Sequence, residues 1–362
     1  MSKKEINNIT LLVHSEFVVF EWGKALIDIF SAQASKYNLK IVCDVKDIDN
    51  YDSPIIILGV DSKWIKSVLD ALKTSRNRIV LIDGIADKNY EYVSHVSADQ
   101  HTTIKKCIDL LKSNQKTKTA LFGVQKNDTS DNIKAVAFSE AFCSDDVYEI
   151  CDDINECCDR LLGNIDKYDS VICTNDILAV YLLMRCKAVG IEIPKQLHLI
   201  GNGDVWIASH VSPSITTVSY NVEATVKMVL QVCENLCDFQ DVAPVNIGFC
   251  GHIINRESTG TKAVVNNCVT NKRIACFNFD YVPICKELSQ IVTLNRVFSS
   301  YSQEKIQILK LLLCGQSISK IAQSVFLSQD TVAYHLKKLY KQLNIHSKKE
   351  LIEILTSYNI TF

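Results

Sequence analysis

The chain has 362 residues, 47% of them hydrophobic, with five prolines and a formal net charge of −2. This length and composition predict two or three folded domains and exclude a disordered or low-complexity chain. The first residues lack the apolar segment of a signal peptide, and no later apolar run is long enough to cross a bilayer. We therefore expect a cytoplasmic protein with no membrane partner.

Fifteen cysteines are scattered along the chain, and no two are spaced as Cys-x-x-Cys. Their odd number and irregular spacing argue against a disulfide framework or a zinc site. We expect reduced thiols that pack as small hydrophobic side chains, with no metal and no cofactor. A metal-binding or redox-sensing role is the alternative.

Residues 8 to 260 alternate short β-branched runs with helical segments, a pattern that predicts an α/β fold with parallel sheets. The expected strands are Ile9 to Val13, Lys40 to Cys43, Ile55 to Leu58, Arg78 to Ile82, Thr119 to Phe122, Ser170 to Cys173 and His198 to Ile200. Helices are expected over Lys24 to Tyr37, Thr102 to Leu111, Ile177 to Lys187 and Val222 to Leu236. In such sheets a ligand lies beyond the carboxyl ends of the strands, which makes the polar residues there candidates for binding.

A series of short motifs in this region occurs in a distinctive order: Val171-Ile-Cys-Thr-Asn-Asp-Ile-Leu-Ala, Gly190-Ile-Glu-Ile-Pro, Leu199-Ile-Gly-Asn-Gly-Asp, Ser212-Pro-Ser-Ile-Thr-Thr-Val and Arg256-Glu-Ser-Thr-Gly. The series resembles the effector domain of the lac-repressor and ribose-binding-protein superfamily, which is periplasmic-binding-protein-like. The resemblance runs from about residue 8 to 260. It implies two α/β lobes joined by three crossovers, with a small polar molecule, often a sugar, bound in the cleft between them.

The resemblance also implies cleft contacts at three residues: Asp83 after an N-lobe strand, Lys134, and Asn175 of the Thr-Asn-Asp run. The family often has arginine where Lys134 stands, and it has a carboxylate where this chain has Gly203. Further candidates follow strand ends: the carboxylate of Asp204 and the aromatic rings of Phe17, Trp22 and Trp206. Ordinary packing is the alternative for each ring. We expect Asp176 to cap the helix that follows it rather than to touch a ligand.

Residues 261 to 297 connect the two recognisable parts of the chain. The segment from Cys285 to Phe298 places Leu288 and Ile291 at helical spacing, which predicts a linking or dimerising helix. The β-rich stretch from Thr261 to Asp280 has no assigned role. A homodimer is expected, and its interface is left open.

The sequence pattern of residues 298 to 362 predicts four short helices. The first runs from about Ser302 to Cys314, ends at Gly315 and offers apolar packing residues: Ile306, Leu309, Leu312 and Leu313. Two more follow Ser317 and Ser328, whose hydroxyls suit the first turn of a helix. The last opens at Ser347-Lys-Lys-Glu350, the pattern of a capping box.

The third of these helices has two unlike faces. An apolar stripe consists of Val332, Leu336, Leu339 and Leu343, and the opposite face carries Asp330, Ala333, Tyr334, Lys337, Lys338 and Lys341. From Phe298 onward, eight lysines stand against four acidic residues, so this part has a net charge of +4 on an otherwise acidic chain. A basic segment of this kind favours contact with phosphates.

This segment resembles the LuxR/FixJ-type helix-turn-helix family, in which matching residues recur at the same offsets: Gly315, Ser317, Ile321, Ala322, Ser328, Thr331, Val332, His335, Lys341 and Leu343. The family usually has a basic residue where Ala333 stands. The resemblance implies an all-α domain that binds double-stranded DNA through the start of the third helix. The residues expected at this interface are Ser328, Thr331, Ala333, Tyr334, Lys337, Lys338 and Lys341.

Together these patterns predict a ligand-responsive transcriptional regulator that is not an enzyme: a two-lobed α/β domain at 8–260, a linker at 261–297 and a helix-turn-helix domain at 298–362. Two alternatives remain. The tail could bind a protein instead of DNA, or the α/β body could be an enzyme, although no Gly-rich phosphate loop and no nucleophile elbow occurs in the sequence. A phosphoacceptor domain would place paired acidic residues after the first strand, where this chain has His14-Ser15-Glu16.

Overall fold

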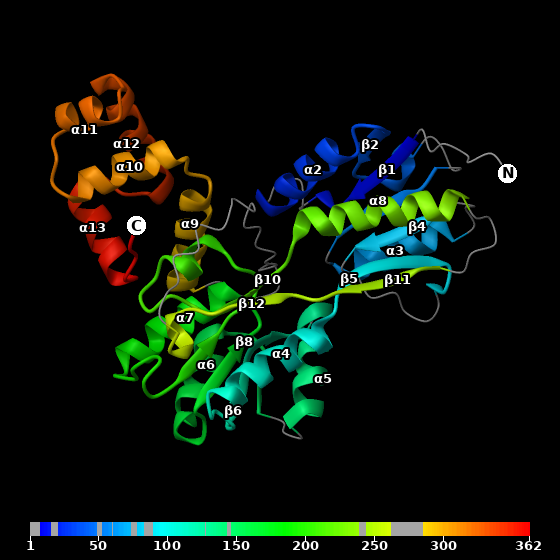
Figure 1. The fold of residues 1–362 in the computed structure, drawn as a ribbon, viewed down its shortest axis with the longest axis horizontal. Helices are drawn as coiled ribbons and strands as arrows, with labels where there is room; N and C mark the ends of the chain where they lie inside the picture. Colours follow the sequence, from blue (N-terminus) through cyan, green and yellow to red (C-terminus); the bar gives the residue numbers. More distant parts are fainter. Residues whose placement is uncertain are drawn as a thin grey trace.

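The computed structural model describes residues 8–15, 21–48, 53–59, 61–73, 78–82, 90–126, 128–142, 146–238, 244–261 and 285–362, and it leaves the side chains of residues 21–25 and 129 outside that description. Within these ranges the chain forms two α/β lobes and a helical carboxyl-terminal domain (Figure 1). No helix in them has both the length and the apolar character of a membrane span.

The N-lobe is a six-stranded parallel sheet with the order β11-β5-β4-β3-β1-β2. Its strands are β1 (Asn8–Val13), β2 (Asn38–Val42), β3 (Ile55–Leu58), β4 (Ile79–Ile82), β5 (Val93–Ala98) and β11 (Asn246–Phe249). Helices α2 (Glu21–Gln33) and α8 (Val222–Asp238) share an apolar core with one face of the sheet, and α3 (Ser62–Leu72) shares one with the other. A short 3₁₀ helix, η1 (Val45–Asp47), follows β2. The central strands β3 and β4 are wholly buried, which explains why both read as unbroken apolar runs.

The C-lobe is a four-stranded parallel sheet with the order β7-β6-β8-β9. Its strands are β6 (Thr119–Gln125), β7 (Val147–Ile150), β8 (Ser170–Cys173) and β9 (His198–Ile200). One face packs on α4 (Gln100–Ser113) and α5 (Thr129–Phe142), and the other on α6 (Ile154–Leu162) and α7 (Asp176–Ala188). Two 3₁₀ helices, η3 (Ile165–Lys167) and η4 (Trp206–Ser209), precede β8 and follow β9.

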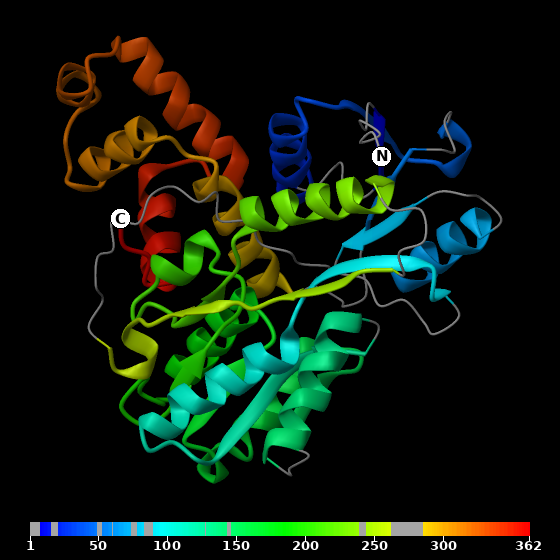
Figure 2. The same cartoon turned by 45° about the vertical axis from the view of Figure 1, so that its right-hand side comes forward.

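Three connections cross between the lobes: β5 to α4, β10 (Thr217–Ser219) to α8, and β11 to β12 (His252–Ile254). Strands β10 and β12 pair antiparallel and form a narrow ribbon at the hinge (Figure 2). A last 3₁₀ helix, η5 (Glu257–Thr259), follows β12 and contacts β9. The two-lobed α/β architecture with three crossovers is therefore confirmed.

The carboxyl-terminal part consists of α9 (Lys286–Ser299), α10 (Gln303–Leu313), α11 (Ile318–Ser324), α12 (Gln329–Leu343) and α13 (Lys348–Ser357). The last four are the predicted helices of the helix-turn-helix domain. Helix α9 lies between this domain and the C-lobe, in contact with α7, η4 and α12 (Figure 1). A single apolar core runs from the C-lobe sheet through α7 and α9 into α12 and α13.

The packing corrects three expectations about these helices. In α10, Leu309 and Leu312 are buried as predicted, together with Ile308, whereas Ile306 and Leu313 are only partly buried. In α12, Leu343 is half-buried, since it lies in the last turn of the helix. In α9, the apolar face containing Leu288 and Ile291 is buried within this chain, so that face is not open to a second copy.

Candidate functional site

The helix-turn-helix is held in shape by side-chain caps at each helix start. The Ser328 hydroxyl accepts a hydrogen bond of 3.1 Å from the Thr331 amide, and the two hydroxyl oxygens lie 2.8 Å apart. At α13, the Glu350 amide donates to the Ser347 hydroxyl (3.2 Å) while the His346 amide donates to the Glu350 carboxylate (3.1 Å). Ser328 and Thr331 thus define where α12 begins. Ser328 is exposed and Thr331 is half-buried at this end of the helix.

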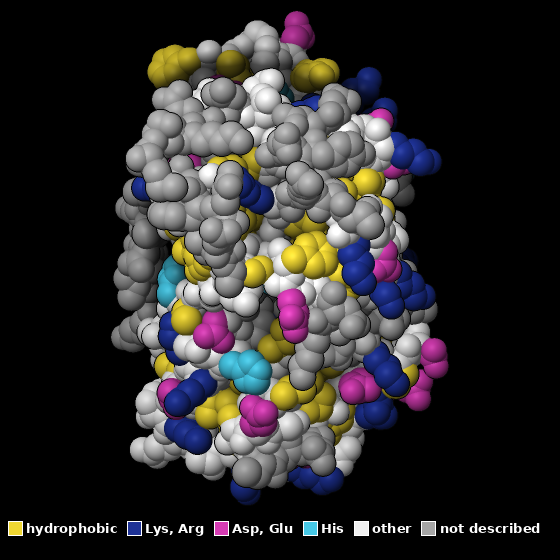
Figure 3. All heavy atoms as spheres, turned by 90° about the vertical axis from the view of Figure 1, so that its right-hand side faces the viewer, with side chains coloured by type: hydrophobic (Ala, Val, Ile, Leu, Met, Phe, Trp, Pro, Cys, Tyr) yellow, Lys and Arg dark blue, Asp and Glu magenta, His cyan; other side chains and the backbone are white. Residues whose placement is uncertain are grey.

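Helix α12 buries one side and exposes the other. Val332, Leu336 and Leu339 are buried, whereas the opposite side is exposed and consists of Ala333, Tyr334, Lys337, Lys338 and Lys341, here called the reading face. The side chain of Tyr334 is 62% exposed. The three lysines of the reading face form no ion pair with any described residue. By contrast, the described basic and acidic side chains on the N-lobe end of the molecule are interspersed (Figure 3).

Asn175 and Asp176 follow β8, and Asn175 rather than Asp176 caps the next helix. Asn175 is the N-cap of α7, and its Oδ1 accepts a 2.8 Å hydrogen bond from the Leu178 amide. Asp176 does not cap the helix. Its carboxylate accepts hydrogen bonds from the Val205 amide (2.8 Å) and the Thr217 hydroxyl (2.6 Å), so it ties α7 to the loop after β9 and to the hinge ribbon.

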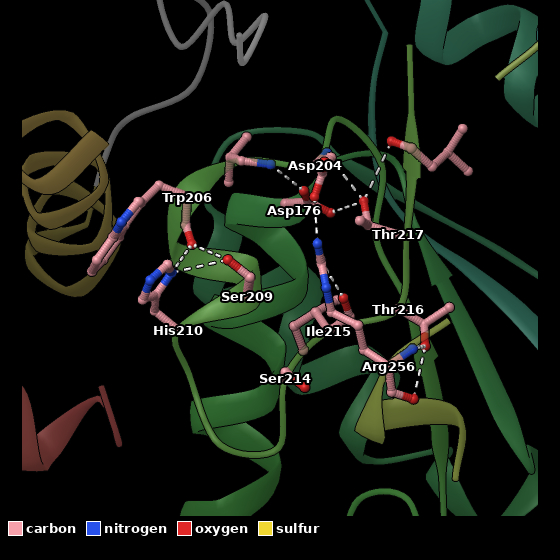
Figure 4. Close-up of polar contacts among 12 residues, drawn as sticks. Asp176, Asp204, Trp206, Ser209, His210, Ser214, Ile215, Thr216, Thr217 and Arg256 are labelled. Carbon is pink, nitrogen blue, oxygen red and sulfur yellow. Dashed lines mark hydrogen bonds and ion pairs between the residues drawn. The ribbon is translucent and has the colours of Figure 1, made fainter. Parts of the chain in front are cut away.

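A buried cluster of charged groups surrounds Asp176. Asp204 is 7% exposed, and its Oδ1 lies 2.5 Å from Nη2 of Arg256, whose Nη1 donates to the Ile215 carbonyl (Figure 4). Burial, and to a smaller extent the charge of Asp204, raise the pKa of Asp176 to about 7, although the hydrogen bonds from Thr217 and Val205 and the charge of Arg256 lower it. Gly203 has φ +120°, a backbone conformation that side chains rarely adopt, which explains why no carboxylate stands there.

Lys134 lies beside this cluster on α5 and is also buried. Its Nζ is 3.0 Å from Oδ1 of Asp131 and donates to the Thr174 carbonyl at 3.2 Å. Burial would lower the pKa of Lys134, but the negative charges of Asp131 and Asp128, the nearby Tyr220 and the hydrogen bond to Asp131 together raise it. Lys134 is therefore a fixed positive charge at the end of β8, paired within the protein.

Further hydrogen bonds connect the C-lobe to the crossover that follows β10. The Tyr220 hydroxyl lies 3.3 Å from Nδ2 of Asn202 and 3.4 Å from Oε1 of Gln100. Tyr220 follows β10, Asn202 follows β9 and Gln100 is the first residue of α4. These three residues therefore meet only once the crossovers have formed. Near them, at the end of β6, the buried Oε1 of Gln125 has no hydrogen-bond partner among the described residues. Buried polar atoms of this kind are usually satisfied by a ligand or water.

Trp206 points away from the charged cluster (Figure 4). It is 9% exposed, stacks on His210 with ring centroids 3.9 Å apart, and lies 5.1 Å from Phe298 and 5.7 Å from Phe362. Because neighbouring rings cover it, this packing does not support the ligand contact expected for Trp206.

The remaining candidates for ligand binding are only partly visible. Phe17 and Asp83 lie outside the described residues. Trp22 belongs to α2, but its side chain lies outside the description. Among the described residues, no three His, Cys, Asp or Glu side chains are grouped so as to hold a metal ion.

Comparison with known proteins finds a matching family for each of the two parts of the chain. Residues 93–259 match a periplasmic binding protein-like domain, and residues 299–355 match the bacterial regulatory proteins of the luxR family. The chain thus combines a periplasmic binding protein-like domain with a luxR-family domain. The second match spans α10 to α12 and most of α13, and therefore contains the whole reading face.

Relatives of the α/β part are regulators of the lac-repressor type. The HTH-type transcriptional regulator GalR of Escherichia coli is 27% identical over 105 residues, which are 29% of this chain and 31% of GalR. The regulator pepR1 of Lactobacillus delbrueckii is 25% identical over 214 residues, covering 57% of this chain and 63% of pepR1. The chain thus spans less than two thirds of either relative.

Solved structures show the same fold. The transcriptional regulator CelR in complex with cellobiose aligns with a TM-score of 0.57 and 14% identity, over 71% of this chain and 85% of CelR. The regulator CcpA of Lactococcus lactis aligns with a TM-score of 0.55 and 19% identity, over 70% of this chain and all of CcpA.

Proposed function

We propose that this protein is a cytoplasmic transcriptional regulator whose α/β cleft binds a small polar effector and whose carboxyl-terminal domain binds double-stranded DNA, in the form of a homodimer. The observation that carries the proposal is the reading face of α12. It is an exposed, unpaired basic surface on a helix whose opposite side is buried, within a domain of a family of regulators.

The arrangement of the reading face suggests how contacts are divided. Tyr334 and Lys337 lie nearer the start of α12 and would face base edges, whereas Lys338 and Lys341 would contact phosphates. Because Ser328 and Thr331 already bond to each other, they would act mainly by fixing the start of the helix and offering its amides to a phosphate.

The effector would occupy the cleft next to Lys134, Asn175, Tyr220 and Gln125. These groups offer a buried cation, amides and a hydroxyl, which suit a polar molecule rich in hydroxyl groups. CelR was solved with cellobiose, so sugars are the first class to test. An effector can act on DNA binding only through different affinities for the open and closed lobes.

The test of DNA binding uses the full chain, because cutting before residue 298 would uncover the core shared with α9. Duplexes are selected from a random-sequence pool and their Kd values are compared for the wild type and Lys337→Ala. Lys320→Ala, a charge-matched change on α11, is the control. We expect a selected sequence that the Lys337 variant binds at least about fivefold more weakly, because a base contact contributes roughly 1–3 kcal/mol. Failure to select any sequence, with no duplex bound, would reject DNA binding.

The test of effector binding measures the melting temperature with a panel of mono- and disaccharides. A sugar that binds the folded protein raises the melting temperature in a concentration-dependent way. We expect Tyr220→Phe, which removes only the hydroxyl, to reduce that rise, whereas Tyr148→Phe, on the outer strand β7, should not. No response to any sugar would exclude this class and leave other polar effectors.

A further inference from the structure

Four aromatic rings meet where the C-lobe touches the DNA-binding domain. They belong to Trp206 and His210 at η4, Phe298 at the end of α9, and Phe362, and we call them the aromatic junction. The centroids of Phe298 and Phe362 lie 5.2 Å apart and their rings are nearly perpendicular, with an interplanar angle of 75°. Three segments distant in sequence therefore share one packed cluster.

Hydrogen bonds hold the same three segments together. The Ile207 amide donates to Oδ1 of Asn295 on α9 at 3.0 Å, and the Thr361 amide donates to the His210 carbonyl at 2.7 Å. Nδ2 of Asn359 donates to the Ser212 carbonyl at 3.0 Å. Both α9 and the residues after α13 are thus attached to the loop that follows β9.

The opposite end of that loop belongs to the charged cluster beside the cleft. Asp204 pairs with Arg256, and the amide of the next residue, Val205, donates to Asp176. One residue later comes Trp206, whose ring lies in the aromatic junction. Figure 4 shows Trp206 and His210 on one side of this loop and Asp176, Asp204 and Arg256 on the other. The loop cannot absorb a shift of Asp204 locally, because Val205, Ile207 and Ala208 are fully buried and closely packed.

We infer that the segment from Asp204 to His210 carries a change in the cleft to the DNA-binding domain, with Trp206 as the positioning residue. The inference rests on the proposed function, since it supposes both a cleft effector and a DNA partner. Repacking of the loop at Asp204 turns Trp206, and Trp206 moves Phe298 and Phe362 with it. Helix α9 contacts α12, so the same movement reorients the reading face. No unfolding of a connecting segment is required.

The experiment is a double-mutant cycle in the full chain. Asp204→Asn perturbs the cleft end of the loop, and Phe362→Ala removes one ring from the junction. Phe142→Ala is the matched control: its ring is also partly buried and packs on Phe138 at 4.9 Å, but on α5. The Kd for one duplex selected from a random pool is measured for Asp204→Asn alone and in each background. Thr217→Val, which removes the hydroxyl shared by Asp176 and Asp204, replaces Asp204→Asn if that variant does not fold.

We expect Asp204→Asn to change the Kd at least about fivefold, the lower range of coupling between sites. This factor should fall to about one in the Phe362→Ala background and persist in the Phe142→Ala background. Equal factors in all backgrounds, or no effect of Asp204→Asn, would overturn the inference. A readout without DNA is amide hydrogen exchange: Asp204→Asn should speed exchange at Ile207 and Thr361 and leave Leu11 in the N-lobe unchanged. If the full chain selects no duplex, the proposed function fails. The exchange rates alone then decide whether a change at Asp204 reaches Ile207 and Thr361.

Discussion

Replacing Asp176 by asparagine removes a fully buried carboxyl group, and its effect on stability should depend strongly on pH. The folded-state pKa of Asp176 is raised from 3.8 to about 7, first by burial and then by the charge of Asp204. Between these two values the folded protein holds a proton that the unfolded chain releases. The wild type is therefore progressively destabilised as pH rises from about 4 to about 7.

The magnitude follows from the two pKa values. Three pKa units at about 1.4 kcal/mol each give roughly 4 kcal/mol in total, of which roughly 2 to 3 kcal/mol falls between pH 5 and pH 8. Urea unfolding of the wild type and Asp176→Asn is followed by circular dichroism at both pH values. Between pH 5 and pH 8, the free energy of unfolding of the wild type should fall relative to that of Asp176→Asn by that amount. Parallel pH dependences for the two proteins would refute the reasoning, because they would mean that Asp176 is ionised in the fold at pH 5.

Four other substitutions test three further expectations. Lys338→Ala and Lys341→Ala should each weaken binding to all DNA sequences about equally and flatten the logarithmic salt dependence of affinity by about one unit; an unchanged slope would remove that lysine from the phosphate contacts. Phe326 has φ +58° and a side chain that is 95% exposed, so Phe326→Gly should stabilise the protein by about 1 kcal/mol in urea unfolding, whereas a loss of stability would mean that the ring packs. In Gly201→Ala the added β-carbon would overlap Oδ1 of Asp176 and lie 3.2 Å from its Cα, so a loss of about 1–3 kcal/mol is expected in the same assay, and an unaltered transition would contradict it.

The buried central strands were predictable from local sequence. Ser170 to Cys173 and His198 to Ile200 form strands over the predicted residues, because a strand covered on both faces needs a short apolar run. Strand β5 was not predicted. Its sequence, VSHVSA, has two serines and a histidine among the apolar residues, and it is held between β4 and β11. Its partner β11 comes about 150 residues later in the chain, so only long-range pairing defines it.

The candidate site was predictable by position and much less by role. Strand ends located Asn175, Asp176 and Asp204 in the correct region, but which of them caps α7 depends on the hydrogen bonds that Val205 and Thr217 bring from other segments. Trp206 follows a strand end in sequence, yet its environment is set by α9 and the residues after α13, which begin eighty residues later. Local patterns carry no information about such docking.

The continuous core from the C-lobe through α9 to α13 also determines how the molecule comes apart. Groups that share one core lose their packing together, whereas the N-lobe has two cores of its own. On heating, the C-lobe and the DNA-binding domain should therefore melt as one cooperative unit and the N-lobe as another. We expect the boundary between these two units to lie at the hinge ribbon of β10 and β12, inside the stretch of residues 93–259 that matches one domain family.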